Sequence, residues 1–455
     1  ENAEVARQAL EKLEQRVQGG FAPLEESPMT VMPIQTPVMM AGFHPGVVEL
    51  MTPVFKRFGM IPVQGGGTSA QAESEEVPLE PGAVLGIQFV RGDASAYGSG
   101  TVTYVRGNKV LAFGHPMMGM GKTSLPMAGG RVDFLIPSLM ASSKPASPAR
   151  AIGTLIRDDQ YGIMGIVGKQ PEFIPMKVRF TSRNNTQPRE YNFEIAKHRL
   201  FSPMYIFMTA IDAIYSAEKS MGDYTMKTHA EIKLKNHPTI LKDNVFSGIY
   251  PDEVAMEFAM PFYQLMQNRF EEVDIESVLL EISSDDNRTN AQIDSVCVNK
   301  NRVKPGDPLE VTVFLIPYMQ DTVVKRIEVI VPIDMPEGLS ILRISDAVSS
   351  EVWERSRAPM KSRISDVSHL IQQIQEEESN SDIIVEILAP KAGVTIRGDE
   401  LPALPLTAFN VINSSRQTGN SGLTYGTTFL KQRVHTEYVV SGGAVLPLNI
   451  DRDAP

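Results

Sequence analysis

Hydrophobic and polar positions along this chain alternate in short runs of the kind that form β-strands. Runs rich in Val, Ile, Thr and Tyr are separated by turn residues, and 34 Gly and 32 Pro are spread through the 455 residues. Short alternating runs bounded by such turns are typical of antiparallel hairpins. The pattern predicts strands in the ranges 31–40, 83–115, 151–156, 163–167, 173–181, 190–196 and 224–234. The sequence therefore predicts a mainly β protein.

A period close to that of a helix appears in a few segments between the strands. The pattern predicts helices at 3–18, 45–59, 203–221, 251–269 and 348–378. Pro45 stands in the first turn of the second of these segments and Gly59 follows its last turn, as helix termini favour. The full expectation is thus an α+β arrangement in which strands predominate.

Changes in pattern divide the chain into four predicted parts. A polar, glycine-rich stretch at 65–76 is the best early linker. Strands at regular spacing from 291 to about 450, interrupted by a helical insert at 348–378, indicate a β-sandwich-like module. We therefore predict an N-terminal α/β segment with linker, a strand-rich domain, a helical connector with one strand, and the sandwich, at 1–78, 79–245, 246–290 and 291–455 respectively.

Composition narrows the class of protein. The formal charge of −11 and the absence of a basic stripe argue against nucleic-acid binding, which needs clustered Lys and Arg. No run of 18 apolar residues is present, so no transmembrane segment is expected. Cys297 is the only cysteine, which excludes a disulfide framework and a thiolate metal site within the chain. Its apolar strand predicts a buried, inert thiol.

One segment imitates a phosphate-binding loop. Gly121-Lys122-Thr123 has the ending of a Walker A motif and follows an apolar strand. The loop requires a glycine where Pro116 stands, and proline has no amide hydrogen to give to a phosphate. Pro126 then falls inside the first turns of the helix that should follow. A glycine-rich loop in a β-structure explains these residues better than a nucleotide site.

Other polar clusters have structural interpretations. Asp158 and Asp159 are adjacent, so in a strand their carboxylates point to opposite faces, and we expect them to cap a hairpin turn. The seven histidines show no metal-binding spacing such as HExxH. The acidic run at 376–378 is expected to be a solvated helix end. We therefore predict neither a metal site nor a cofactor.

Four motifs between 98 and 168 agree in order and spacing. They read Gly98-Ser-Gly100-Thr-Val-Thr-Tyr, Leu111-Ala-Phe-Gly114-His115-Pro, Gly153-Thr-Leu-Ile-Arg-Asp-Asp and Tyr161-Gly-Ile-Met-Gly165. Together they resemble the SpoIVB-type serine peptidase family over about 80–235, a third of the chain. The resemblance implies a chymotrypsin-like double β-barrel at about 80–240. It also implies that His115 is the general base of a Ser-His-Asp triad.

The nucleophile segment departs from the family pattern. The family has a Gly-x-Ser-Gly-Ser-Pro turn after a helix, whose amides form the oxyanion hole. Here the equivalent stretch at 220–228 reads SMGDYTMKT and has no Ser-Gly pair. Ser220 and Thr225 are the remaining candidate nucleophiles, and no segment matches the strand that carries the family's Asp. We therefore expect a catalytically inactive protein; the alternative is an active serine peptidase that uses His115 as general base on itself or on an envelope protein.

Residues outside the central motifs extend the resemblance. Ile34-Gln-Thr-Pro37, Gly42-Phe43 and the module at 290–450 look like accessory parts of long SpoIVB-domain proteins of bacteria, which are exported. This implies a place in the periplasm or on the cell surface, and the start at Glu1, without Met, fits a processed chain. Protein partners or self-association are expected, with a homo-oligomer as one form. The single Trp353 argues against sugar binding by the C-terminal module.

Overall fold

The computed structural model describes residues 35–65, 77–135, 137, 144–183, 185–217, 222–361, 363–396, 399–401, 407 and 421–454. The chain divides into two compact units, Glu1–Gln35 and Thr36–Pro455, and the described helices and strands all belong to the second. The predicted helix at 3–18 lies outside the described residues, as does most of the predicted linker at 65–76.

The first part of this unit is built on one large mixed sheet. Its elements are β1 (Thr36–Ala41), α2 (Pro45–Arg57), β2 (Met60–Gln64), β3 (Val84–Gly92), β4 (Ser95–Arg106), β5 (Lys109–Ala112), β6 (Gly121–Val132), β7 (Ala146–Asp159), β8 (Gly162–Val167), β9 (Phe173–Ser182), β10 (Asn185–Ala196), α3 (Ser202–Ala217), β11 (Tyr224–Leu234), β12 (Ile240–Gly248), α4 (Asp252–Gln267) and β13 (Ile275–Asp285). The strand order is β12-β11-β13-β9-β10-β3-β6-β7-β8-β5-β4-β1-β2.

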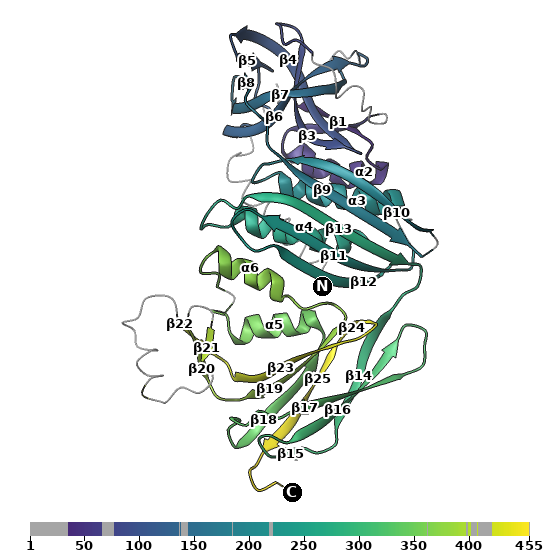
Figure 1. The fold of residues 1–455 in the computed structure, drawn as a ribbon, viewed down its shortest axis with the longest axis vertical. Helices are drawn as coiled ribbons and strands as arrows, with labels where there is room; N and C mark the ends of the chain where they lie inside the picture. Colours follow the sequence, from purple (N-terminus) through teal and green to yellow (C-terminus); the bar gives the residue numbers. More distant parts are fainter. Residues whose placement is uncertain are drawn as a thin grey trace, which may run out of the picture. The chain divides into compact units, whose positions relative to one another are not determined.

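Part of this sheet closes on itself. β3 pairs with β6 and also with β4, so the six strands β3-β6-β7-β8-β5-β4 form a closed ring. The strands from β10 to β12 instead form an open sheet, and helices α3 and α4 lie along one face of it (Figure 1). The structure thus contains one closed ring followed by an open sheet where the sequence predicted two barrels.

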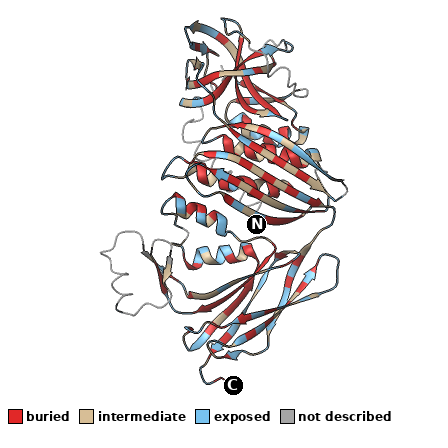
Figure 2. Cartoon of the chain, viewed as in Figure 1, coloured by how far each residue is buried: buried red, intermediate tan, exposed pale blue. Residues whose placement is uncertain are grey.

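Alternation along the strands explains which face of the open sheet the helices cover. In β11, Ala230, Ile232 and Leu234 are buried, whereas Lys227 and Lys233 on the other face are exposed. Successive side chains of a strand point to opposite faces, so one face enters the core and the other remains polar. The same alternation of buried and exposed positions is visible along the neighbouring strands (Figure 2).

The C-terminal part has a hydrophobic core of its own. Its elements are β14 (Asn290–Val298), β15 (Arg302–Val303), β16 (Pro308–Pro317), β17 (Val323–Ile330), β18 (Gly338–Ser345), α5 (Ala347–Arg357), α6 (Val367–Glu376), β19 (Asp382–Ala389), β20 (Gly393–Ile396), β21 (Asp399–Leu401), β22 (Ser421–Thr424), β23 (Thr427–His435), β24 (Val439–Ser441) and β25 (Gly443–Ile450). The sheets β17-β16-β14-β24 and β15-β25-β18-β19-β23 bury apolar side chains in one common cluster. This is the arrangement of two packed sheets.

The predicted helical insert at 348–378 consists of two helices rather than one. Helix α5 ends at Arg357, before Pro359, and α6 begins at Val367. Proline cannot donate in a helix and disfavours helical geometry in the residue before it, which explains the break. The apolar residues of α6 belong to the core of the first part, so the insert joins the two parts of the unit.

The other expectations for the fold divide into confirmed and corrected ones. A mainly β structure is confirmed, and the predicted helices at 45–59, 203–221 and 251–269 are α2, α3 and α4 with ends shifted by a few residues. The prediction for Cys297 is wrong, because this thiol is exposed. The pairing of β14 with β16 shifts between Ile293 and Ser295, and such a bulge changes which side chains face the core.

The acidic run at 376–378 is a solvated helix end only in part, because Glu376 is exposed and Glu377 is 38% exposed, whereas Glu378 is largely buried. Glu377 pairs with Lys242 of β12, and burial, opposed by that lysine, raises the pKa of Glu377. Glu378 is only 7% exposed and lies 2.6 Å from Lys431 Nζ. Sequence alone does not show these partners because both lysines come from distant strands.

Candidate functional site

The loop that carries His115 joins β5 to β6 in the closed ring. Phe113 and Gly114 both have positive φ, at 76° and 74°, and the amide of Phe113 donates to the carbonyl of Thr101 at 2.8 Å. Positive φ is uncommon for a bulky residue such as phenylalanine, so this turn needs support from its surroundings.

Glycines of the four motifs between 98 and 168 allow neighbouring side chains to pack closely against this turn. A Cβ on Gly100 would stand 2.4 Å from the ring of Phe113, and one on Gly98 would stand 2.5 Å from Met117 Cε. A Cβ on Gly165 would stand 2.1 Å from Met127 Sδ. The glycines therefore make room for the His115 loop and for the strands beneath it. The glycines in the four motifs between 98 and 168 are thus explained by the close packing around this loop.

A buried carboxylate holds the other end of the loop. Asp158 of β7 has no exposed surface, and its oxygens accept hydrogen bonds from the amides of Met117 and Met118, both at 2.8 Å, and of Met120 at 3.4 Å. Asp159 lies on the opposite face and pairs with Arg157 at 2.7 Å, and the hydrogen bond from that arginine lowers the pKa of Asp159. Opposite faces were expected, but Asp158 anchors a loop and does not cap the hairpin turn.

The imidazole of His115 is half-buried, and its hydrogen bond within the described chain goes to the next residue. Nδ1 lies 2.8 Å from the carbonyl oxygen of Pro116. Because a carbonyl only accepts, Nδ1 carries the proton and the lone pair is on Nε2. In a Ser-His-Asp triad an aspartate takes the place of this carbonyl.

Of the two candidate nucleophiles, Ser220 and Thr225, the structure describes only Thr225. Ser220 lies outside the described residues. Thr225 of β11 is buried, and its hydroxyl donates to the carbonyl of Asn287 at 2.6 Å and lies 3.0 Å from the hydroxyls of Ser247 and Thr289. These contacts tie the sheet to the segment that enters the C-terminal part. In the strand order, seven strands lie between β11 and β5, and the structure does not bring Thr225 to His115.

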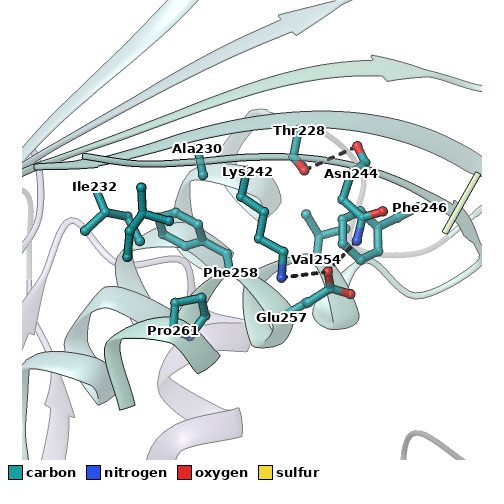
Figure 3. A pocket seen from close by; sticks show the side chains of 11 residues that line it. Thr228, Ala230, Ile232, Lys242, Asn244, Phe246, Val254, Glu257, Phe258 and Pro261 are labelled. Carbon is teal, nitrogen blue, oxygen red and sulfur yellow. Dashed lines mark hydrogen bonds and ion pairs between the residues drawn. The ribbon is translucent and has the colours of Figure 1, made fainter. Parts of the chain in front are cut away.

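A small cavity lies between the open sheet and α4, with Lys242, Asn244 and Glu257 around it (Figure 3). Lys242 Nζ lies 3.5 Å from a carboxylate oxygen of Glu257 and also pairs with Glu377. Burial disfavours the charged ammonium, but the two glutamates outweigh it and raise the pKa of Lys242. The cavity volume of about 20 Å³ holds roughly one water molecule, so this is a structural charge cluster.

The polar face of the open sheet carries a larger cleft that sequence reasoning missed. His229 and His435 both line it, although they lie on β11 and at the end of β23, far apart in the chain. No local spacing links them, and the only signal available was the polar side of the alternation in β11. Among the described residues, no group of three or more His, Cys, Asp and Glu side chains is placed to hold a metal ion.

Comparisons with protein families, with curated proteins and with solved structures give no match to this chain. Over the described residues, no helix is both long and apolar enough to cross a membrane.

Proposed function

We propose that this protein is a catalytically inactive relative of the SpoIVB-type peptidases that serves as a structural or protein-interaction scaffold of the bacterial envelope. The observation that supports it most is that, among the described residues, no carboxylate meets Nδ1 of His115. Nδ1 of His115 is bonded to the carbonyl of Pro116, and the buried carboxylate of Asp158 is bonded to loop amides. Thr225 is engaged in a separate network of hydroxyls.

The barrel assignment belongs to the same proposal. The closed ring of β3 to β8 contains His115, and in the family this histidine lies in a barrel. We assign the ring to the first barrel of that fold. The place in the envelope and the tendency to self-associate rest on the resemblance of the accessory segments.

One observation favours the alternative, an active serine peptidase acting on itself or on an envelope protein. The hydrogen bond on Nδ1 leaves the lone pair of Nε2 available, which is the tautomer a general base requires. A backbone carbonyl orients the ring, although it cannot stabilise a protonated imidazole as an aspartate does. Ser220 is the hydroxyl that this alternative needs.

A fluorophosphonate probe distinguishes the two functions, because it labels only a serine or threonine that is activated by a base. We expect no labelling of the full chain under conditions in which an active serine protease is labelled completely. Labelling that disappears in both His115→Ala and Ser220→Ala would establish the peptidase and overturn the scaffold. Thr225→Val tests the other candidate hydroxyl in the same way, with circular dichroism to confirm that each variant is folded.

A further inference from the structure

A cleft of about 830 Å³ lies on the polar face of the open sheet. Its floor comes from β9, β10, β11, β12 and β13, and its wall from Ser379, Asp382 and His435 of the C-terminal part. A volume of this size is within the range of sites that bind small molecules or short peptides. Clefts at the junction of two hydrophobic cores are frequent places for such sites.

One row of side chains crosses the floor from strand to strand. The register places Glu190, Arg179, Glu281, His229 and Asp243 directly opposite one another on five successive strands. The guanidinium of Arg179 lies 2.9 Å from Glu190 and 2.8 Å from Glu281. The charge of this arginine is therefore matched within the row.

Two histidines of the cleft share one arrangement. Nδ1 of His229 lies 2.7 Å from a carboxylate oxygen of Asp243, and Nδ1 of His435 lies 3.2 Å from one of Asp382 and 3.1 Å from the hydroxyl of Ser381. A carboxylate on Nδ1 favours the proton on that nitrogen and leaves Nε2 as an acceptor. Neither Nε2 has a partner among the described residues, so each is available to a donor from a ligand.

The neighbouring row on the same face consists of hydrogen-bond donors. Thr181, Ser283 and Lys227 stand opposite one another on β9, β13 and β11, two residues along each strand from the charged row. Lys227 is exposed, and within the described chain it is the charged residue of the cleft that has no partner. An ammonium beside two hydroxyls is suited to a carboxylate.

The remaining charges decide which anion fits. The charged side chains that line the cleft are Arg179, Lys227, Glu190, Glu281, Asp243 and Asp382, so carboxylates outnumber cations when both histidines are neutral. A phosphate dianion would meet repulsion from these carboxylates. A ligand that carries an ammonium and amide hydrogens as well as a carboxylate would be attracted at both ends.

We propose that this cleft binds a short peptide with free termini. Lys227, Thr181 and Ser283 hold its terminal carboxylate, and the Nε2 atoms of His229 and His435, with the carboxylates behind them, receive its amide and ammonium hydrogens. The proposal goes beyond the scaffold function and does not depend on whether His115 is catalytic.

Calorimetric titration of the full chain with triglycine tests the site, with triglycinamide and N-acetyl-triglycine as the ligands that lack one terminal charge each. We expect triglycine to bind and both derivatives to bind about five-fold more weakly or worse, since a lost charge pair has roughly this effect on affinity. Inorganic phosphate should bind more weakly than triglycine. Equal affinity for triglycine and triglycinamide, tighter binding of phosphate, or no binding of triglycine would each overturn the proposal.

Matched variants on one strand locate the site. Lys227→Met should weaken triglycine binding about five-fold or more, as the removal of the carboxylate from the ligand does. Lys233→Met, on the same face of β11 but outside the cleft and paired with Glu231, should leave binding unchanged. Both lysines are exposed, so the variants should fold, and circular dichroism checks this. An unchanged affinity in Lys227→Met would contradict the assignment.

Discussion

The hydrogen bonds of Asp158 allow a quantitative prediction for the His115 loop. Replacing Asp158 by alanine removes two strong bonds to the amides of Met117 and Met118 and a weaker one to Met120. A hydrogen bond to a charged group contributes about 1.5–3 kcal/mol, and a buried amide left without an acceptor adds to the loss. We therefore expect Asp158→Ala to lower the free energy of unfolding by about 3–5 kcal/mol.

Asparagine at the same position gives a sharper test. Asp158→Asn keeps the shape and one acceptor oxygen, but it turns an NH₂ group toward amides that also donate. The loss should be about 2–4 kcal/mol, a large part of the about 5–15 kcal/mol that stabilises a typical domain. Urea denaturation followed by circular dichroism measures it, and hydrogen exchange of the peptide that contains Met117 should become faster.

The neighbouring aspartate is the matched control. Asp159 is exposed, and it pairs with Arg157 at the surface. Asp159→Asn should therefore change the urea midpoint very little. If Asp158→Asn and Asp159→Asn unfold at the same urea concentration, the conclusion that Asp158 anchors the loop is wrong.

Three further predictions concern other parts of the molecule. Gly100→Ala should destabilise the protein by about 1–3 kcal/mol, because its Cβ would stand 2.4 Å from the Phe113 ring. The same substitution should cost less in a protein that already carries Phe113→Ala. An equal loss in both backgrounds would exclude a clash with the ring. Lys242→Met should cost about 1–2 kcal/mol in urea denaturation, because it removes the cation of Glu257 and Glu377, whose side chains are 34% and 38% exposed and therefore partly screened by water. The exposed Lys233→Met should cost little. Burial raises the pKa of Asp212 from 3.8 to about 6, against a hydrogen bond from a backbone amide. The folded state therefore binds this proton more tightly, and the stabilisation is complete below about pH 4 and disappears as the pH rises through 6. The stability of wild type relative to Asp212→Asn should fall over this interval in denaturation measured at several pH values, and a constant difference would refute the shift.

Much of the fold could be predicted because local patterns carry it. The strand at 224–234 follows from the alternation of apolar and polar residues. The start of the second predicted helix follows from Pro45, a residue that helix N-termini favour. Both signals depend only on residues that are close in the sequence. The break in the insert could also have been predicted from a local signal, because Pro359 stands in the sequence directly after the first helix. The prediction instead joined the two helices into one. Cys297 shows the limit, since its apolar strand predicted a buried thiol, whereas the thiol is exposed in a strand whose pairing shifts between Ile293 and Ser295.

The sequence by itself determined that this protein is mainly β and that glycines stand in the motifs around His115. Only the tertiary structure decided what each polar group does there. Asp158 meets the loop amides, and Lys242 meets Glu377, through contacts between strands and helices far apart in the chain. The cleft has the same origin, because His229 and His435 reach it through sheet register and the packing of two cores. Local sequence carries propensity and periodicity, whereas partners distant in the chain are selected by topology and burial.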